Sequence, residues 1–157
     1  MTDLTCAIDT NILVYAEGLN GTEKKVVANT LLDRLATVQT VLAVQTLGEL
    51  FYVLTRKARL SPAEAATAVD EWRERHTIVP TSTGVFEKAS ALAASSGYQI
   101  WDCIILVAAA EAGCHLLLSE DMHEGFVYRG VTIANPFAER LHPLLASLLD
   151  ASPGPNK

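Results

Sequence analysis

Residues 4–11 read LTCAIDTN, a largely apolar run that stops at an aspartate, a threonine and an asparagine. A short apolar run of this kind is typical of a strand that is covered on both of its faces. We therefore predict a buried strand over residues 4–8 and a helix that begins near Ile12. This first strand–helix unit places Asp9 directly after the carboxyl end of the strand.

Similar short apolar runs recur along the chain and alternate with stretches of helical periodicity. The clearest helix start is Ser61-Pro62-Ala63-Glu64, in which a serine cap, a proline and a glutamate come in the expected order. Further strands are predicted at 41–44, 77–80, 115–118 and 131–134, and helices at 23–35, 46–57, 62–75, 83–95 and 103–112. Alternating strands and helices predict an α/β fold, with a mainly parallel central sheet and helices on both of its faces.

Length and composition indicate one globular domain. The chain has 157 residues, of which 50% are hydrophobic and 19% charged, a balance that suits a packed core rather than a disordered chain. We expect a single domain over residues 1–150 and a frayed tail over 151–157. The start of the chain is acidic where a signal peptide is basic, and the longest apolar run, 103–110, is too short to cross a bilayer. A cytoplasmic protein without membrane contact is therefore expected.

The three cysteines, Cys6, Cys103 and Cys114, lie in apolar stretches and show no C-x-x-C spacing. Their odd number and their spacing argue against a disulfide framework or a thiolate zinc site. We expect them to be buried as small hydrophobic side chains in a reducing compartment.

The formal net charge of −6 argues against nonspecific nucleic-acid binding by a broadly basic surface. It favours a divalent cation, if the acidic residues cluster, or a basic protein partner. Any contact with a phosphate backbone would have to come from local clusters of basic residues, although each cluster is as well explained as a solvated helix face. The candidates are Lys24 with Lys25, Arg56 with Lys57 and Arg59, and Arg73 with Arg75.

Four acidic residues follow strands or begin the helices that strands lead into: Asp9, Glu49, Asp102 and Asp121. Each has a simpler explanation, since Asp9 and Asp102 suit helix N-caps, Glu49 an exposed helix position and Asp121 a turn. Separate explanations do not account for the recurrence of acids at the same end of the strands. In open α/β sheets this end carries the ligand site.

Carboxylates brought together at one edge repel one another and need a compensating cation. A set of oxygen ligands without paired histidine or cysteine selects a hard ion, Mg²⁺ or Mn²⁺. Such an ion binds phosphate oxygens and activates water, so metal-dependent phosphodiester hydrolysis is the chemistry that these residues suit best.

The ordered set of these segments resembles the PIN-domain ribonuclease family, and within it the VapC-type toxins of bacterial toxin–antitoxin pairs. The resemblance runs in register from about residue 8 to residue 137. It is carried by Asp9-Thr10-Asn11, Glu49, Ile100-Trp101-Asp102, Ala112-Gly113-Cys114, the segment LLSEDM at 117–122 and the segment GVTIANPF at 130–137.

The resemblance implies a PIN-like three-layer α/β/α sandwich, a Mg²⁺- or Mn²⁺-dependent endoribonuclease that cuts RNA, and a VapB-like antitoxin that inhibits it. By position it assigns Asp9, Glu49, Asp102 and Asp121 as the metal-binding and catalytic acids, and Asn11 and Ser119 as their polar supports. Glu120 and Glu124 are candidates to share the task of Asp121.

Two alternatives stay open. The chain could be a non-catalytic PIN-like scaffold that binds RNA or a protein partner, although the presence of all four acids favours catalysis. The apolar stretch 141–149 could pack on the sheet of its own chain or on a second copy, which would make a homodimer.

Overall fold

The structure is a computed structural model that describes residues 4–151. Its centre is one six-stranded sheet with the order β3-β2-β1-β4-β6-β5. Neighbouring strands run parallel except β5 and β6, which are antiparallel. The strands are β1 (Cys6–Ile8), β2 (Thr40–Ala43), β3 (Thr77–Val79), β4 (Leu116–Leu118), β5 (Val127–Tyr128) and β6 (Val131–Ala134). The predicted α/β fold with a mainly parallel sheet is confirmed.

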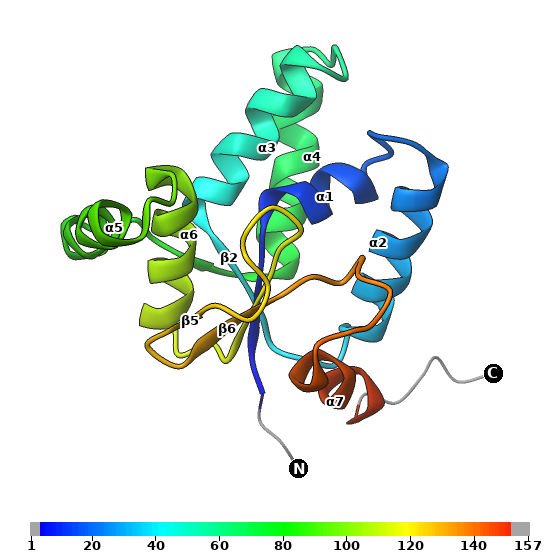
Figure 1. The fold of residues 1–157 in the computed structure, drawn as a ribbon. Coiled ribbons are helices and arrows are strands. Elements are labelled where there is room, and N and C mark those ends of the chain that lie inside the picture. The colour runs from blue at the N-terminus through cyan, green and yellow to red at the C-terminus, as the bar shows by residue number, and fades with distance from the viewer. Residues whose placement is uncertain (1–3, 152–157) are drawn as a thin grey trace.

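Helices cover both faces of this sheet (Figure 1). They are α1 (Thr10–Ala16), α2 (Thr22–Arg34), α3 (Val44–Arg56), α4 (Pro62–Arg75), α5 (Thr83–Ser96), α6 (Ile100–Glu111) and α7 (Pro143–Ala151). Helices α5 and α6 pack on one face, and α1, α2, α3, α4 and α7 contribute to the core on the other. Among the described residues, no helix is both long enough and apolar enough to span a membrane.

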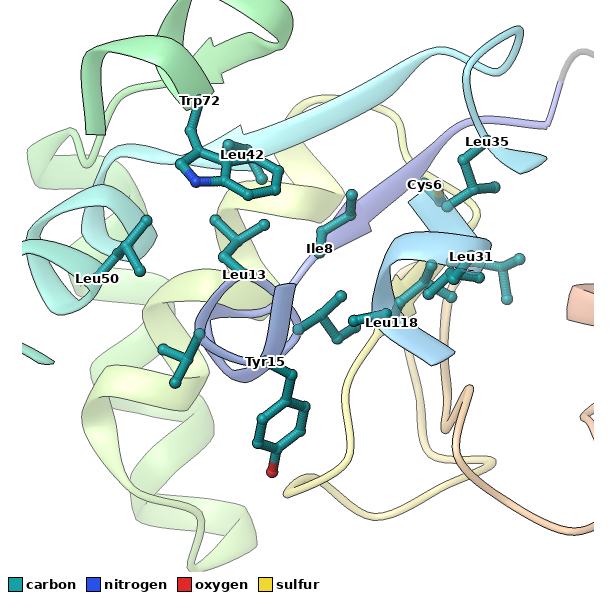
Figure 2. Packing of buried hydrophobic residues seen from close by; sticks show 14 of the residues in the cluster. Cys6, Ile8, Leu13, Tyr15, Leu31, Leu35, Leu42, Leu50, Trp72 and Leu118 are labelled. Atoms are coloured by element: carbon teal, nitrogen blue, oxygen red, sulfur yellow. The ribbon is translucent and has the colours of Figure 1, made fainter. Parts of the chain in front are cut away.

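The alternation of side chains along β1 divides the interior into two cores. Cys6 and Ile8 enter one cluster together with Leu42 of β2 and Leu118 of β4, and Figure 2 shows them beside Leu13, Leu50 and Trp72. Ala7 points to the opposite face and packs with α5 and α6. Because both faces are covered, the central strands β1 and β4 are apolar throughout.

The local signals that the sequence offers for helix ends are used. Ser61 and Glu64 form a reciprocal capping box at the start of α4, with Pro62 as its first residue. All three cysteines are buried and free. Helix α7 places Leu145, Leu148 and Leu149 in the core of its own chain, so the apolar stretch 141–149 packs internally and does not support a homodimer. The predicted tail at 151–157 begins where α7 ends, and residues 152–157 lie outside the described residues.

Three elements differ from the sequence prediction. Helix α7 is one of them, because residues 141–149 are predicted only as an apolar stretch. The two-residue strand β5, which pairs with β6, is not predicted because its residues, Val127 and Tyr128, are too few to form a pattern. Helix α6 begins at Ile100 with Gln99 as its N-cap, so Asp102 lies within the first turn and is not the cap residue. Gln99 makes no side-chain capping hydrogen bond, and the sequence therefore gives no sign of this earlier start.

Candidate active site

Asp9 is the most enclosed acid of the site. It follows β1, forms the N-cap of α1 and is only 4% exposed. Its Oδ1 accepts a hydrogen bond from the backbone N–H of Thr10 at 2.7 Å. The N-cap explanation of Asp9 is therefore correct, but it accounts for only one of its two carboxylate oxygens.

The second oxygen of Asp9 is held by Ser119. Strands β1 and β4 are parallel neighbours, with Ile8 paired to Leu118, so the residues that follow them lie side by side. The buried Ser119 hydroxyl donates to Asp9 Oδ2 at 2.7 Å and accepts from the N–H of Met122 at 3.2 Å. The Ser119 side chain thus contacts an acid of the predicted set.

Glu49 lies one turn into α3 and is partly buried against α1. The Thr10 hydroxyl donates to its Oε2 at 2.6 Å, and the Gln45 amide donates to its Oε1 at 3.0 Å. Thr10 therefore joins two of the acids, because its backbone N–H binds Asp9 and its hydroxyl binds Glu49. Sequence reasoning missed Thr10, although its place inside Asp9-Thr10-Asn11 was the available signal.

Asp102 and Asp121 complete the set from two further segments. Asp102 lies in the first turn of α6 and is partly buried. Its carboxylate has no hydrogen bond or salt bridge to any residue within 4–151. Asp121 is exposed in the loop after β4, and its Oδ2 accepts a hydrogen bond from the Asn11 side-chain amide. The Asn11 side chain thus contacts a second acid of the predicted set.

The two candidates to share the task of Asp121 are engaged elsewhere. Glu120 accepts a hydrogen bond from the Tyr15 hydroxyl at 2.8 Å and pairs with Lys24. In Figure 2 the Tyr15 hydroxyl points away from the other labelled side chains of the core cluster. Glu124 accepts from the backbone N–H of Asn135 at 3.4 Å.

Burial and mutual repulsion make this an electrostatically unfavourable place for negative charge. The pKa of Asp9 is raised to about 7, first by burial and also by the nearby charges of Asp102 and Glu49. The hydrogen bonds from Ser119 and Thr10 act in the opposite direction and lower it. The pKa of Asp102 is raised by burial first, and then by Glu49 and Asp121. The hydrogen-bond partners of Asp9 are both neutral groups, so neither of them compensates its negative charge.

The chemistry of the donor set suits a hard divalent cation, since it consists of four carboxylates from one edge of the sheet with no histidine or thiolate among them. The unpartnered carboxylate of Asp102 and the raised pKa of Asp9 both point to such an ion. The side chains do not form a complete coordination site: within residues 4–151, no three acidic, histidine or cysteine side chains lie close enough together to hold a metal ion.

A cavity of about 340 Å³ opens between α1 and α3, and Glu49 is the one member of the four acids that lines it. Thr10, Asn11 and Glu49 line it on the side of the carboxylates, and the remaining lining residues come from the exposed face of α3: Gln45, Gly48, Tyr52 and Val53. A larger cavity of about 760 Å³ lies between α2 and the end of α4, and none of the four acids lines it. The smaller cavity is the one that can bring a ligand to the carboxylates.

Comparisons with known proteins agree on the fold. Residues 6–123 match the family model described as the PIN domain. No curated protein matches the sequence. Among solved structures, the chain is similar to VapBC2 from Rickettsia felis bound to a promoter DNA fragment, with 19% identity, a TM-score of 0.62 and coverage of 84% of this chain and 98% of that one.

Two further structures show the same likeness. DNA-bound VapBC from Salmonella typhimurium is 18% identical, with a TM-score of 0.61 and coverage of 85% of this chain and 98% of that one. VapC20 of Mycobacterium tuberculosis, a toxin that cleaves the sarcin-ricin loop, is 18% identical, with a TM-score of 0.57 and coverage of 71% and 86%. At these identities the likeness establishes a shared fold.

Proposed function

The chain belongs to the PIN domain family, and we propose that it is a Mg²⁺- or Mn²⁺-dependent endoribonuclease that acts as the toxin of a VapBC-type pair. The observation that carries this proposal is the buried Asp9 carboxylate, which neutral donors hold in place while Glu49 and Asp102 raise its pKa. A buried, repelled carboxylate lowers the stability of the folded protein, and a bound cation would offset this loss.

In this proposal Asp9 and Asp102 hold the metal ion, and Glu49 and Asp121 lie beside it. The metal ion supplies positive charge for the phosphate oxygens and lowers the pKa of a water molecule into the range of a nucleophile. Ser119 and the N–H of Thr10 fix the two oxygens of Asp9, and the Thr10 hydroxyl fixes Glu49.

Asp121 has the role of proton acceptor. It is exposed, and the Asn11 amide occupies only its Oδ2. Its Oδ1 is therefore available to take a proton from the attacking water, while Asn11 fixes the orientation of the carboxylate.

A VapB-like antitoxin is the proposed partner, and RNA in the cytoplasm is the proposed substrate. Support for the partner comes from the similar solved structures, of which several are toxin–antitoxin complexes. The acidic edge of the sheet suits a partner segment that carries arginine, because guanidinium groups bind carboxylates in bidentate fashion. Antitoxin affinity that is unchanged in Asp9→Asn would contradict this mode of inhibition.

The function is tested by mapping new 5′ ends in total cellular RNA incubated with the purified protein and Mn²⁺. The controls are EDTA and Asp9→Asn, which keeps the size of the side chain and its capping oxygen. We expect new ends at few positions, absent from both controls. Total RNA is used because a toxin with a narrow target would spare a generic oligonucleotide.

One observation favours the alternative of a non-catalytic scaffold, namely that no three of the acidic, histidine or cysteine side chains within residues 4–151 lie close enough to hold an ion. If folded protein that binds Mn²⁺ in solution produces no new RNA ends, the scaffold is the correct function. If Mn²⁺ does not bind at all, the metal site itself is refuted.

A further inference from the structure

The exposed face of α3 continues from the carboxylates toward the end of the helix. Gly48, Tyr52 and Arg56 follow one another at intervals of four residues, so they lie on one face, adjacent to Glu49. Gly48, Glu49 and Tyr52 line the cavity of about 340 Å³. We call Gly48, Tyr52 and Arg56 the α3 strip.

Tyr52 is the aromatic member of the α3 strip. Its side chain is 62% exposed, the largest exposed fraction among the large hydrophobic residues of the described chain. The Arg56 guanidinium lies 5.8 Å from the centre of its ring. An exposed ring next to a cation is the arrangement that proteins use to stack a nucleic-acid base and bind its phosphate.

Gly48 is unusual because it lies in the middle of a helix, where glycine costs up to about 1 kcal/mol relative to alanine. A Cβ atom added to Gly48 would meet no other atom within 4 Å. Packing within the chain therefore does not require glycine here. The absence of a side chain keeps the cavity open between Glu49 and Tyr52, which is an advantage for a ligand only.

The charges at the end of α3 are available for binding. Arg56, Lys57 and Arg59 are exposed and form no salt bridge with any residue that the structure describes. The other predicted basic clusters are engaged wholly or in part: Lys24, though not Lys25, pairs with Glu120, and Arg73 and Arg75 pair with carboxylates of their own helix. In a chain with a net charge of −6, unpaired cations at the end of α3 suit a polyanion.

We propose that the α3 strip binds single-stranded RNA, with one base stacked on Tyr52 and a neighbouring phosphate bound by Arg56. This inference rests on the proposed ribonuclease function and adds to it the surface that leads the strand to the acids. Glu49 and Arg56 are seven residues apart, or about 10 Å along the helix at 1.5 Å per residue. That span matches about three stacked nucleotides at 3.4 Å each.

The test measures the affinity for fluorescein-labelled oligoadenylate by fluorescence anisotropy, in EDTA, with the RNA checked for integrity on a gel. Tyr52→Ala should weaken binding roughly 10-fold or more, because base–aromatic stacking contributes about 1–3 kcal/mol per base. Tyr52→Phe keeps the ring and should bind like the wild type. Phe86→Ala is the matched control, since Phe86 is 50% exposed on α5, a helix that packs in the other of the two cores.

Two further variants separate the parts of the α3 strip. Arg56→Ala should reduce the slope of log affinity against log salt by about 0.7, the value for one phosphate contact on a single strand. Gly48→Ala should raise the melting temperature, because alanine favours a helix, and yet weaken RNA binding several-fold. A stabilised protein that binds less well cannot be explained by damage to the fold.

Tyr52→Ala that binds as tightly as the wild type, or no more weakly than Phe86→Ala, overturns the inference. The inference is also overturned if Tyr52→Ala changes the molar mass of the protein in solution, measured by light scattering, while RNA affinity stays unchanged. That result would make the α3 strip an interface between copies of the chain. If the wild type cuts cellular RNA while these variants bind normally, only the α3 strip is refuted. If the wild type neither cuts nor binds RNA, the proposed function fails as well.

Discussion

Replacement of Ser119 by alanine should weaken metal binding in a way that depends on pH. The Ser119 hydroxyl donates to Asp9 Oδ2 at 2.7 Å, and both groups are buried. A hydrogen bond to a charged group contributes about 1.5–3 kcal/mol, which corresponds to about 1–2 pKa units at 1.36 kcal/mol per unit. Because the pKa of Asp9 is already about 7, Ser119→Ala should leave most of this carboxyl protonated at neutral pH.

The measurement is Mg²⁺ affinity by isothermal titration calorimetry at pH 7 and at pH 9. At pH 7 we expect the affinity to fall roughly 10- to 100-fold, the usual effect of removing a group that holds a metal ligand. At pH 9 the deficit should shrink, because the carboxyl then ionises even without the hydroxyl. Ser82→Ala is the matched control. The Ser82 hydroxyl caps α5 by accepting a 3.1 Å hydrogen bond from the N–H of Val85, so this variant removes a cap that bonds none of the four acids.

Two results would refute this reasoning. If Ser119→Ala binds Mg²⁺ as well as Ser82→Ala does, the hydroxyl does not control Asp9. If the deficit is equally large at both pH values, Ser119 acts by holding the loop through the N–H of Met122 and not through the charge of Asp9.

Three further predictions concern stability. The folded protein keeps a proton on Asp9 that the unfolded chain releases above about pH 4. The free energy of unfolding of the metal-free protein should therefore fall by on the order of 3–4 kcal/mol as pH rises to about 7. Thermal melts of Asp9→Asn in EDTA should lack this loss. Thr46→Val should raise the melting temperature by roughly 2–4 °C, because the buried Thr46 hydroxyl has no hydrogen-bond partner among the described residues; a lower value would show that the hydroxyl is satisfied. Glu120→Gln keeps an acceptor for Tyr15 but removes the charge facing Lys24, so calorimetry should give an unchanged Mg²⁺ affinity with a drop in melting temperature of roughly 2 °C or less; a 10-fold loss of affinity would make Glu120 a ligand.

The parts of the site that follow from the main chain could be predicted from the sequence. Apolar runs locate β1 and β4, and a parallel sheet brings their carboxyl ends together, so Asp9 and Ser119 become neighbours whatever their side chains do. The capping box of α4 is equally local, because Ser61 and Glu64 satisfy each other within one turn. Prediction succeeds where the cause lies within a few residues or follows from strand order.

Contacts between side chains from different elements could not be predicted. Thr10 lies in a segment that the sequence singles out, but its hydroxyl meets Glu49 only because α1 packs against α3. The second oxygen of Asp9 and one oxygen of Asp121 are likewise engaged by partners 110 residues away, Ser119 and Asn11. Such pairings depend on packing, which a single sequence does not encode in any local pattern.

The orientation of Glu49 shows where the limit lies. Leu47, Leu50 and Leu54 are buried and fix which face of α3 meets the core, and this places Glu49 on the flank of that face. Once the phase is fixed by burial, the α3 strip must lie on the exposed side, since its members are displaced from the leucines by the helical repeat of 3.6 residues. One helix thus anchors the core, presents a carboxylate and exposes a ring and a cation. The sequence contains the periodicity for all three, but only packing against β2 and α1 decides which residues point where.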